Sequence, residues 1–191
     1  MKKLTRQDIL GPRRYADARD DLRARTIARK RRRRVHVGPQ VTIVFENRET
    51  MAFQIEEMCR AEGLEDDAKI QEEIDVYNKV LPDDGQLGAT LFVEVASEAQ
   101  VKRVLERLVG LQDHVWLVVG GHRVRATFDP EQFANDKFAA VQYLKFALSA
   151  EEQTAMRAAG TAVAVAIDHP NYRHQAGLDD DQRIELANDL I

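Results

Sequence analysis

The fold class follows from one short stretch, VWLVVGGHRVRATF, which occupies residues 115–128. Two runs rich in β-branched residues flank the pair Gly120-Gly121, and paired glycines accept the positive φ angles that a tight hairpin turn requires. The stretch therefore predicts two antiparallel strands, 115–119 and 123–128, that belong to one sheet.

Outward from this hairpin, helical and strand periods alternate along the chain. Further strands are expected at 35–37, 41–45, 90–95, 142–148 and 161–167, and helices at 12–33, 51–62, 70–81, 101–109, 149–160 and 180–190. This order predicts an α+β fold with a mixed, mostly antiparallel sheet of about five to seven strands covered by helices. We expect a single domain, in which a basic helical arm at 1–34 precedes an α+β body at 40–191.

Charge is distributed unevenly over the 191 residues, although the net charge is only −4. Residues 1–34 hold 14 Lys and Arg against 4 Asp and Glu, whereas residues 46–84 hold 13 acidic against 4 basic side chains. The sequence therefore predicts that a basic head and an acidic body attract each other.

Cys59 is the only cysteine, which excludes an internal disulfide and any site that needs several thiolates. The first residues lack the apolar core of a secretion signal, and no apolar run approaches the ~20 residues of a membrane span. We expect a cytoplasmic protein.

The run Arg29-Lys30-Arg31-Arg32-Arg33-Arg34 is the strongest local charge signal. Six adjacent cations bind phosphates with a gain from counterion release, so nucleic-acid binding by 29–34 is one alternative, with the last four arginines as candidate binding residues. Against it, cations are also favoured at a helix C-terminus, the rest of the chain is acidic, and no interleaved aromatic residues offer base stacking. We therefore do not expect nucleic acid to be the partner.

The segment Asp168-His169-Pro170-Asn171-Tyr172 leaves the end of an apolar strand, and the residue before a proline is held extended. His169, Asp168 and Tyr172 are therefore candidate catalytic residues, and Asn171 is a candidate binding residue. His169 and His174 could hold a transition metal, because imidazole and carboxylate suit zinc, iron or manganese. The structural alternative is a histidine and a tyrosine that bind backbone groups at a turn.

A second group of polar residues flanks the apolar stripes of the two acidic helices. Such half-buried groups converge on a ligand in many binding sites, but they also pair with one another. The candidate carboxylates are Glu57 and Glu73, and the candidate binding residues are Gln54, Tyr77 and Asn78.

Several motifs of known chemistry are missing from the sequence. It has no glycine-rich phosphate loop, no Gly-x-Ser-x-Gly elbow and no Cys-x-x-Cys pair, and no cofactor is evident from any motif. Cys59 lies in an apolar helical stripe, which indicates a core position.

Several segments together resemble a bacterial family that is known only as a domain of unknown function. They are Lys3 to Arg6, the basic run with Val35, Gly38-Pro39, the helix with Gln54-Ile55-x-Glu57-Met58, residues 70–78 and residues 168–172. The resemblance covers nearly the whole chain and transfers no catalytic residue. Because members are often encoded near rubrerythrin-like and iron–sulfur oxidoreductase genes, it implies an accessory role in bacterial redox or peroxide defence.

Three functional hypotheses follow. The first is an accessory protein, dimeric, that docks through its charged helices to a protein partner such as an iron–sulfur oxidoreductase or a rubrerythrin-like protein. The second is a metal-assisted enzyme centred on His169. The third is nucleic-acid binding through 29–34.

Overall fold

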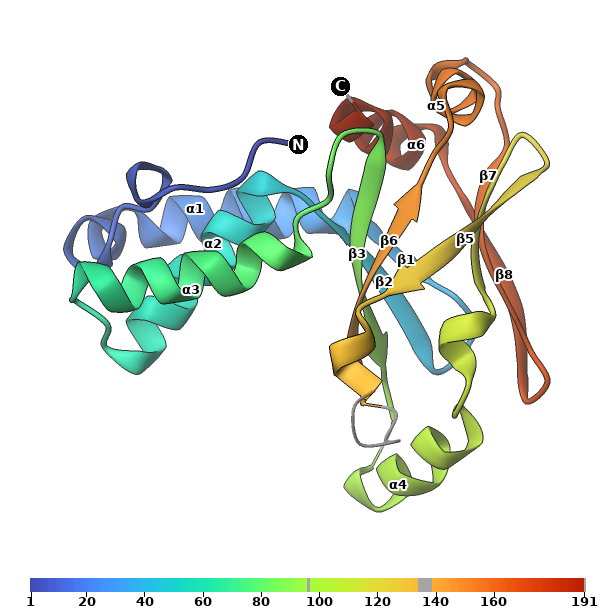
Figure 1. Cartoon of the computed structure of the whole chain (residues 1–191), viewed down its shortest axis with the longest axis horizontal. Coiled ribbons are helices and arrows are strands. Elements are labelled where there is room, and N and C mark those ends of the chain that lie inside the picture. Colours follow the sequence, from blue (N-terminus) through green and yellow to red (C-terminus); the bar gives the residue numbers. More distant parts are fainter. Residues whose placement is uncertain (96, 134–138, 191) are drawn as a thin grey trace.

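Eight strands form one antiparallel sheet within residues 1–95, 97–133 and 139–190, which are the residues that the computed structural model describes. Their order across the sheet is β1-β2-β3-β6-β5-β4-β7-β8 (Figure 1). The strands are β1 (Arg34–His36), β2 (Val41–Glu46), β3 (Gln86–Val93), β4 (Val115–Val119), β5 (His122–Phe128), β6 (Val141–Ala147), β7 (Val163–His169) and β8 (Tyr172–Leu178).

The expected α+β class is confirmed, but the expected strand count of five to seven was too low, and all the strand pairs within the described residues are antiparallel. The strand that the sequence did not reveal is β8. It begins with three exposed polar residues after Tyr172, so it lacks the apolar alternation that marks a strand.

The predicted hairpin is present, with Gly120 and Gly121 at φ angles of 57° and 92°. In its register Trp116 lies opposite Arg125, and Val118 lies opposite Arg123. Residues directly opposite in an antiparallel pair share one face of the sheet, so these four side chains point away from the core.

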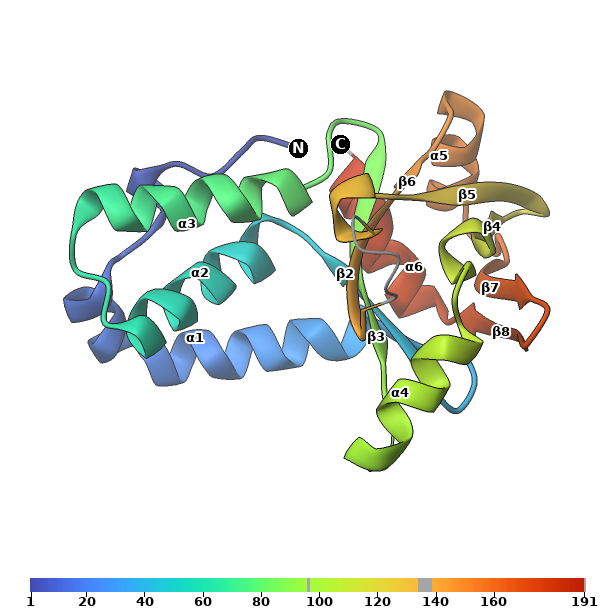
Figure 2. The same ribbon diagram turned by 60° about the horizontal axis from the view of Figure 1, so that its bottom comes forward.

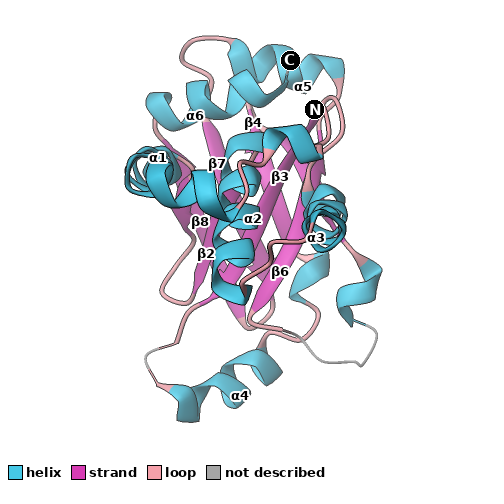
Figure 3. Ribbon diagram, turned by 90° about the vertical axis from the view of Figure 1, so that its left-hand side faces the viewer, coloured by secondary structure: helices cyan, strands magenta, loops and turns pink. Residues whose placement is uncertain are grey.

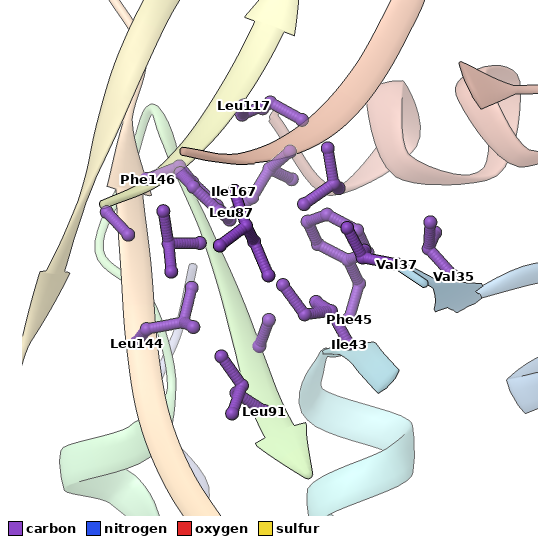
Figure 4. Close-up of a cluster of buried hydrophobic side chains, with 14 of the residues drawn as sticks. Val35, Val37, Ile43, Phe45, Leu87, Leu91, Leu117, Leu144, Phe146 and Ile167 are labelled. Carbon is purple, nitrogen blue, oxygen red and sulfur yellow. The ribbon is translucent and has the colours of Figure 1, made fainter. Parts of the chain in front are cut away.

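The sheet curves until its two edge strands, β1 and β8, come close together. Its inward side chains form one buried core, part of which Figure 4 shows, with Phe45, Leu87 and Phe146 among them. Tyr172 of β8 belongs to the same core as Val35 of β1, so the sheet is nearly a closed barrel.

Helices pack around this sheet in separate groups, as Figures 1 and 3 show. Three lie together on one side, α5 and α6 lie at one end, and α4 lies at the other. The helices are α1 (Pro12–Arg32), α2 (Arg48–Glu62), α3 (Asp67–Val80), α4 (Glu98–Arg107), α5 (Ala150–Arg157) and α6 (Asp180–Ala187). In the described part of the chain, no helix combines the length and the apolar character needed to cross a bilayer.

Local sequence signals set the ends of the first two helices. Pro12 occupies the first turn of α1, Asn47 caps α2 by accepting two backbone hydrogen bonds, and Gly63 ends α2 in the left-handed conformation. Helix α1 buries only Tyr15, as the thin apolar content of residues 12–33 predicts.

The helices α2 and α3 have a core of their own, which we call the helical core. Leu4 and Ile9 from the N-terminal segment are buried in it, so this segment is packed against the body of the protein. The other buried members are Met51, Ile55, Cys59, Ile70, Ile74, Val80 and Leu81.

Candidate functional site

His169 ends strand β7 and is buried at the turn between β7 and β8. Its Nε2 atom lies 3.0 Å from the backbone oxygen of Val109, and its Nδ1 atom accepts a 3.2 Å hydrogen bond from the backbone N–H of Asn171. These partners fit an imidazole that is protonated on Nε2. Both ring nitrogens hold the turn in place, so a metal ion at His169 would have to replace one of these hydrogen bonds.

Tyr172 links the two edges of the sheet. Its hydroxyl donates a 2.7 Å hydrogen bond to the backbone oxygen of Val37 and accepts hydrogen bonds from the backbone N–H groups of Gln40 and Val41. Burial raises the pKa of this hydroxyl above its usual value, although the two backbone N–H groups oppose the shift. The hydroxyl therefore satisfies three backbone groups at the junction between β8 and the β1–β2 turn.

Two further candidates surround this turn. The ring of His174 is exposed and lies 4.5 Å from the Tyr172 ring, measured between centroids. Gly38 faces both: a Cβ atom there would lie 2.5 Å from His174 Cγ and 2.7 Å from the Tyr172 hydroxyl. Asn171 donates through Nδ2 to the backbone oxygen of Arg107 at 3.0 Å, which ties the turn to the end of α4.

Asp168 points to the opposite, outer side of the sheet and binds three donors. Its carboxylate accepts hydrogen bonds from Arg123 at 2.6 Å, from the Trp116 indole at 3.0 Å and from His114 Nδ1 at 3.2 Å. The hydrogen bond from Arg123 is the main reason that the pKa of Asp168 falls to about 2. Asp168 is therefore a fixed anion that orients its three donors.

These donors belong to a larger surface that we call the outer sheet face, which β5, β4, β7 and β8 form. Arg123 stacks on the Trp116 ring, with its guanidinium carbon 4.3 Å from the ring centroid. A shallow hollow of about 500 Å³ lies beside this pair. By strand register the outer sheet face comprises Trp116, Val118, Arg123, Arg125, Ala164, Ala166, Asp168, Arg173 and Gln175.

The remaining candidates lie on α2 and α3, away from this surface. Glu57 accepts hydrogen bonds from Tyr15 at 2.6 Å and from Arg19 at 2.7 and 3.0 Å. The Arg19 hydrogen bonds are the main cause that lowers the pKa of Glu57 to about 2. Glu57 therefore fastens α1 to α2.

Asn78 has a similar structural role in α3, because its side-chain amide accepts from the backbone N–H of Leu4 at 2.8 Å and donates to the Leu4 oxygen at 2.9 Å. Burial raises the pKa of Tyr77, although the neighbouring Gln54 side chain opposes the shift. Burial, together with the nearby Glu62 and Glu72, raises the pKa of Glu73.

The candidates thus form two groups rather than one pocket. His169, Tyr172 and Asp168 lie at the β7–β8 turn, whereas Glu57 and Glu73 lie on helices on the other side of the sheet (Figure 1). Within the described ranges, no group of three or more His, Cys, Asp or Glu side chains is placed to hold a metal ion.

The basic run at 29–34 pairs largely with the protein's own carboxylates. Arg33 is only 1% exposed and binds Glu185 and Asp189, while Lys30 lies 3.3 Å from the buried Glu46. Weaker pairs join Arg29 to Glu49, Arg32 to Glu185 and Arg34 to Glu94, whereas Arg31 has no ion pair with any residue in the described ranges. The predicted attraction between head and body is confirmed, and it uses most of the cations that would otherwise face phosphates.

Comparison with known proteins gives a family but no activity. The family model described as "Protein of unknown function (DUF3501)" matches residues 3–190. The chain belongs to this family. A DUF3501 assignment agrees with the resemblance found in the sequence to a domain of unknown function.

The fold of this DUF3501 chain is also similar to a solved structure, described as a novel protein of unknown function from Burkholderia pseudomallei K96243. The two chains share 37% identity over 100% of each, with a TM-score of 0.93. A search of curated proteins finds no match.

Sequence reasoning did not single out Trp116, Arg123 or Arg173. The available signal was the alternation within residues 115–128, which places an aromatic residue and two arginines on the outward positions of a hairpin. Asp168 was identified, but its partners lie 45 to 54 residues away in the chain.

Proposed function

We propose that the protein is a cytoplasmic accessory protein that binds a protein partner through the outer sheet face. The observation that carries this proposal is the Arg123–Trp116 stack, which Asp168 holds in place on the outer side of the sheet. Trp and Arg are the residues most enriched at binding hot spots. A side chain that is already held in position loses less entropy when a partner binds.

The charges of this surface favour an acidic partner. Arg125 pairs with Asp113 and Arg123 pairs with Asp168, which leaves Arg173 as the arginine of this face without an ion pair among the described residues. Ala164 and Ala166 lie next to Trp116 and Val118 in the register but are buried, so the half-buried indole ring offers the apolar contact of this face. We therefore infer a partner surface with a carboxylate next to an apolar side chain.

The docking surface differs from the charged helices that the sequence suggested. We move it to the sheet because the basic residues near the end of α1 are mostly held by Glu46, Glu49, Glu185 and Asp189. For the partner we retain the classes that the family resemblance implies, an iron–sulfur oxidoreductase or a rubrerythrin-like protein.

The test is direct titration of the purified chain with these two proteins from the same organism, by calorimetry at about 50 mM and about 200 mM salt. We expect one of them to bind, more weakly at the higher salt concentration. Arg173→Glu is expected to weaken binding at least about tenfold, because it reverses the charge that meets the partner's carboxylate.

Arg103→Glu on α4 is the matched control, since it makes the same charge change on an exposed helix. It is expected to change the affinity less than about threefold. If neither protein binds at either salt concentration, the proposal of a redox partner of these two classes is wrong. If Arg103→Glu and Arg173→Glu weaken binding equally, the assignment of the binding surface to the outer sheet face is wrong.

A further inference from the structure

Helix α1 has a face that points away from the rest of the protein. A shallow hollow of about 420 Å³ on this face is lined only by α1 residues, with Ala24, Ile27 and Ala28 at its centre and charged residues at its ends: Asp20, Arg23 and Arg31. Ile27 is 41% exposed, so its side chain is available for contact at the centre of this hollow. Figures 2 and 3 show α1 along an outer edge of the molecule.

Opposite charges lie at the two ends of this face. Asp20 is at one end and Arg31, in the last turn, is at the other, whereas Arg13, Arg14 and Arg19 accompany Asp17 and Asp21 in the rest of the first half of the helix. Neither Asp20 nor Arg31 forms an ion pair within the part of the chain that the structure describes. On this face, an antiparallel arrangement would place Asp20 of each helix opposite Arg31 of the other, whereas a parallel one would place like charges opposite each other.

We propose that two copies of this chain associate by packing α1 against α1, antiparallel, around a twofold axis that passes between residues 25 and 26. In a twofold contact, each residue meets the one at the same distance on the other side of the axis. Asp20 then faces Arg31 of the second copy, and Ala24 faces its Ile27.

The shapes agree with this arrangement. Ile27 of one copy enters the hollow of the other, where Ala24 and Ala28 let the two helices approach closely. The same contact covers two exposed isoleucine side chains and forms two Asp20–Arg31 ion pairs.

The contact is small, and this sets the expected affinity. Helix α1 has 21 residues and is therefore ~31 Å long, so a single helix pair lies at the low end of interface sizes. We expect a reversible dimer with a dissociation constant on the order of 10 μM. The outer sheet face plays no part in this dimer. A failure of the dimer proposal would therefore leave the proposed partner binding untouched, and the reverse also holds.

Charge reversal gives the decisive test, because the contact is symmetric. Asp20→Arg places two arginines opposite each other at both ends of the contact, and Arg31→Asp does the same with two aspartates. Each variant alone is expected to dimerise at least about tenfold more weakly than the natural chain. An equimolar mixture of the two variants restores both opposite-charge pairs, so it is expected to regain the natural affinity.

The measurement is sedimentation equilibrium of the full chain and its variants, from about 2 μM to about 500 μM. Ile27→Asp is expected to abolish the dimer, and Val76→Asp, at a 56% exposed position on α3, is the control that leaves it unchanged. Circular dichroism melting shows that each variant is folded. The proposal is overturned if the natural chain stays monomeric at the highest concentration, if the mixture does not recover, or if Val76→Asp disrupts the dimer as much as Ile27→Asp does.

Discussion

Arg33, at the end of α1, and Asp189, near the end of the chain, form a two-pronged ion pair with hydrogen bonds of 2.6 and 2.9 Å. The Arg33 side chain is 1% exposed, and Asp189 is 9% exposed. Burial by itself would lower the pKa of Arg33, but hydrogen bonds and charges from Asp189 and Glu185 outweigh it and raise that pKa. Asp189 also accepts a hydrogen bond from Asn47, the cap of α2, so this pair joins α1, α2 and the C-terminal segment.

Replacing Arg33 by alanine is expected to destabilise the protein by about 3–5 kcal/mol, because Glu185 and Asp189 would be left buried without their cation. Urea denaturation measures this loss. Arg31→Ala, on the same helix but exposed, is the matched control and is expected to cost less than about 0.5 kcal/mol at low protein concentration. Equal losses for the two variants would contradict the structural role of Arg33.

The lowered pKa of Glu57 predicts how the free energy of unfolding depends on pH. Its pKa is lowered in the folded protein from 4.5 to about 2, mainly by Arg19, so its contribution is present above pH 4.5 and is lost as the pH falls toward 2. Because Glu57 is partly exposed, we expect that contribution to be on the order of 1 kcal/mol. Glu57→Gln should therefore be less stable than the natural chain at pH 7, and this difference should shrink at pH 3. A difference that grows on acidification would refute this assignment.

Tyr172→Phe tests the closure of the sheet. The change removes only the hydroxyl that satisfies the backbone groups of Val37, Gln40 and Val41, so we expect a loss of about 2–3 kcal/mol and faster amide exchange at residues 40 and 41. Tyr143→Phe serves as control, because the hydroxyl of Tyr143 makes no hydrogen bond with the residues that the structure describes. Thermal unfolding and hydrogen exchange measured by mass spectrometry give the two readouts.

Gly38 and Gly63 separate backbone strain from close packing. Both have positive φ angles, of 79° and 63°, but a Cβ atom at position 38 would collide with His174 and Tyr172, whereas at position 63 it would meet nothing within 4 Å. Gly63→Ala is expected to cost about 1 kcal/mol from strain alone. Gly38→Ala is expected to cost at least about 1 kcal/mol more, which chemical denaturation can resolve. If the two costs are equal, the packing of Tyr172 and His174 against Gly38 is not tight in solution.

Much of the fold could be predicted because its signals are local. The hairpin at 115–128 has its glycine pair, and the helices that begin near 12 and 48 have their proline and asparagine. Strand β8 could not be predicted, because it is an edge strand whose side chains at 173, 174 and 175 all reach solvent. The number of strands therefore came out too low.

The candidate site was less accessible to sequence reasoning. His169 and Tyr172 were chosen as candidate catalytic residues, but the backbone groups that they bind, at Val109 and Val37, lie 60 and 135 residues away. The basic run looked available for phosphates because the partners of Arg33, Glu185 and Asp189, lie 152 and 156 residues away from it. Such long-range pairing is decided by the tertiary fold, and no spacing within the sequence reveals it.

In a complete barrel, backbone hydrogen bonds would join the two edge strands. Here the hydroxyl of Tyr172 joins β8 to backbone groups at the β1–β2 turn instead. A barrel that is closed by a side chain can open between its two edge strands. Opening would expose the unpaired backbone groups of β1 and β8 to other molecules. Unpaired margins are the starting points of strand-to-strand aggregation. We therefore expect the Tyr172 hydroxyl to limit aggregation through these sheet edges, because it holds the edge strand β8 against the β1–β2 turn.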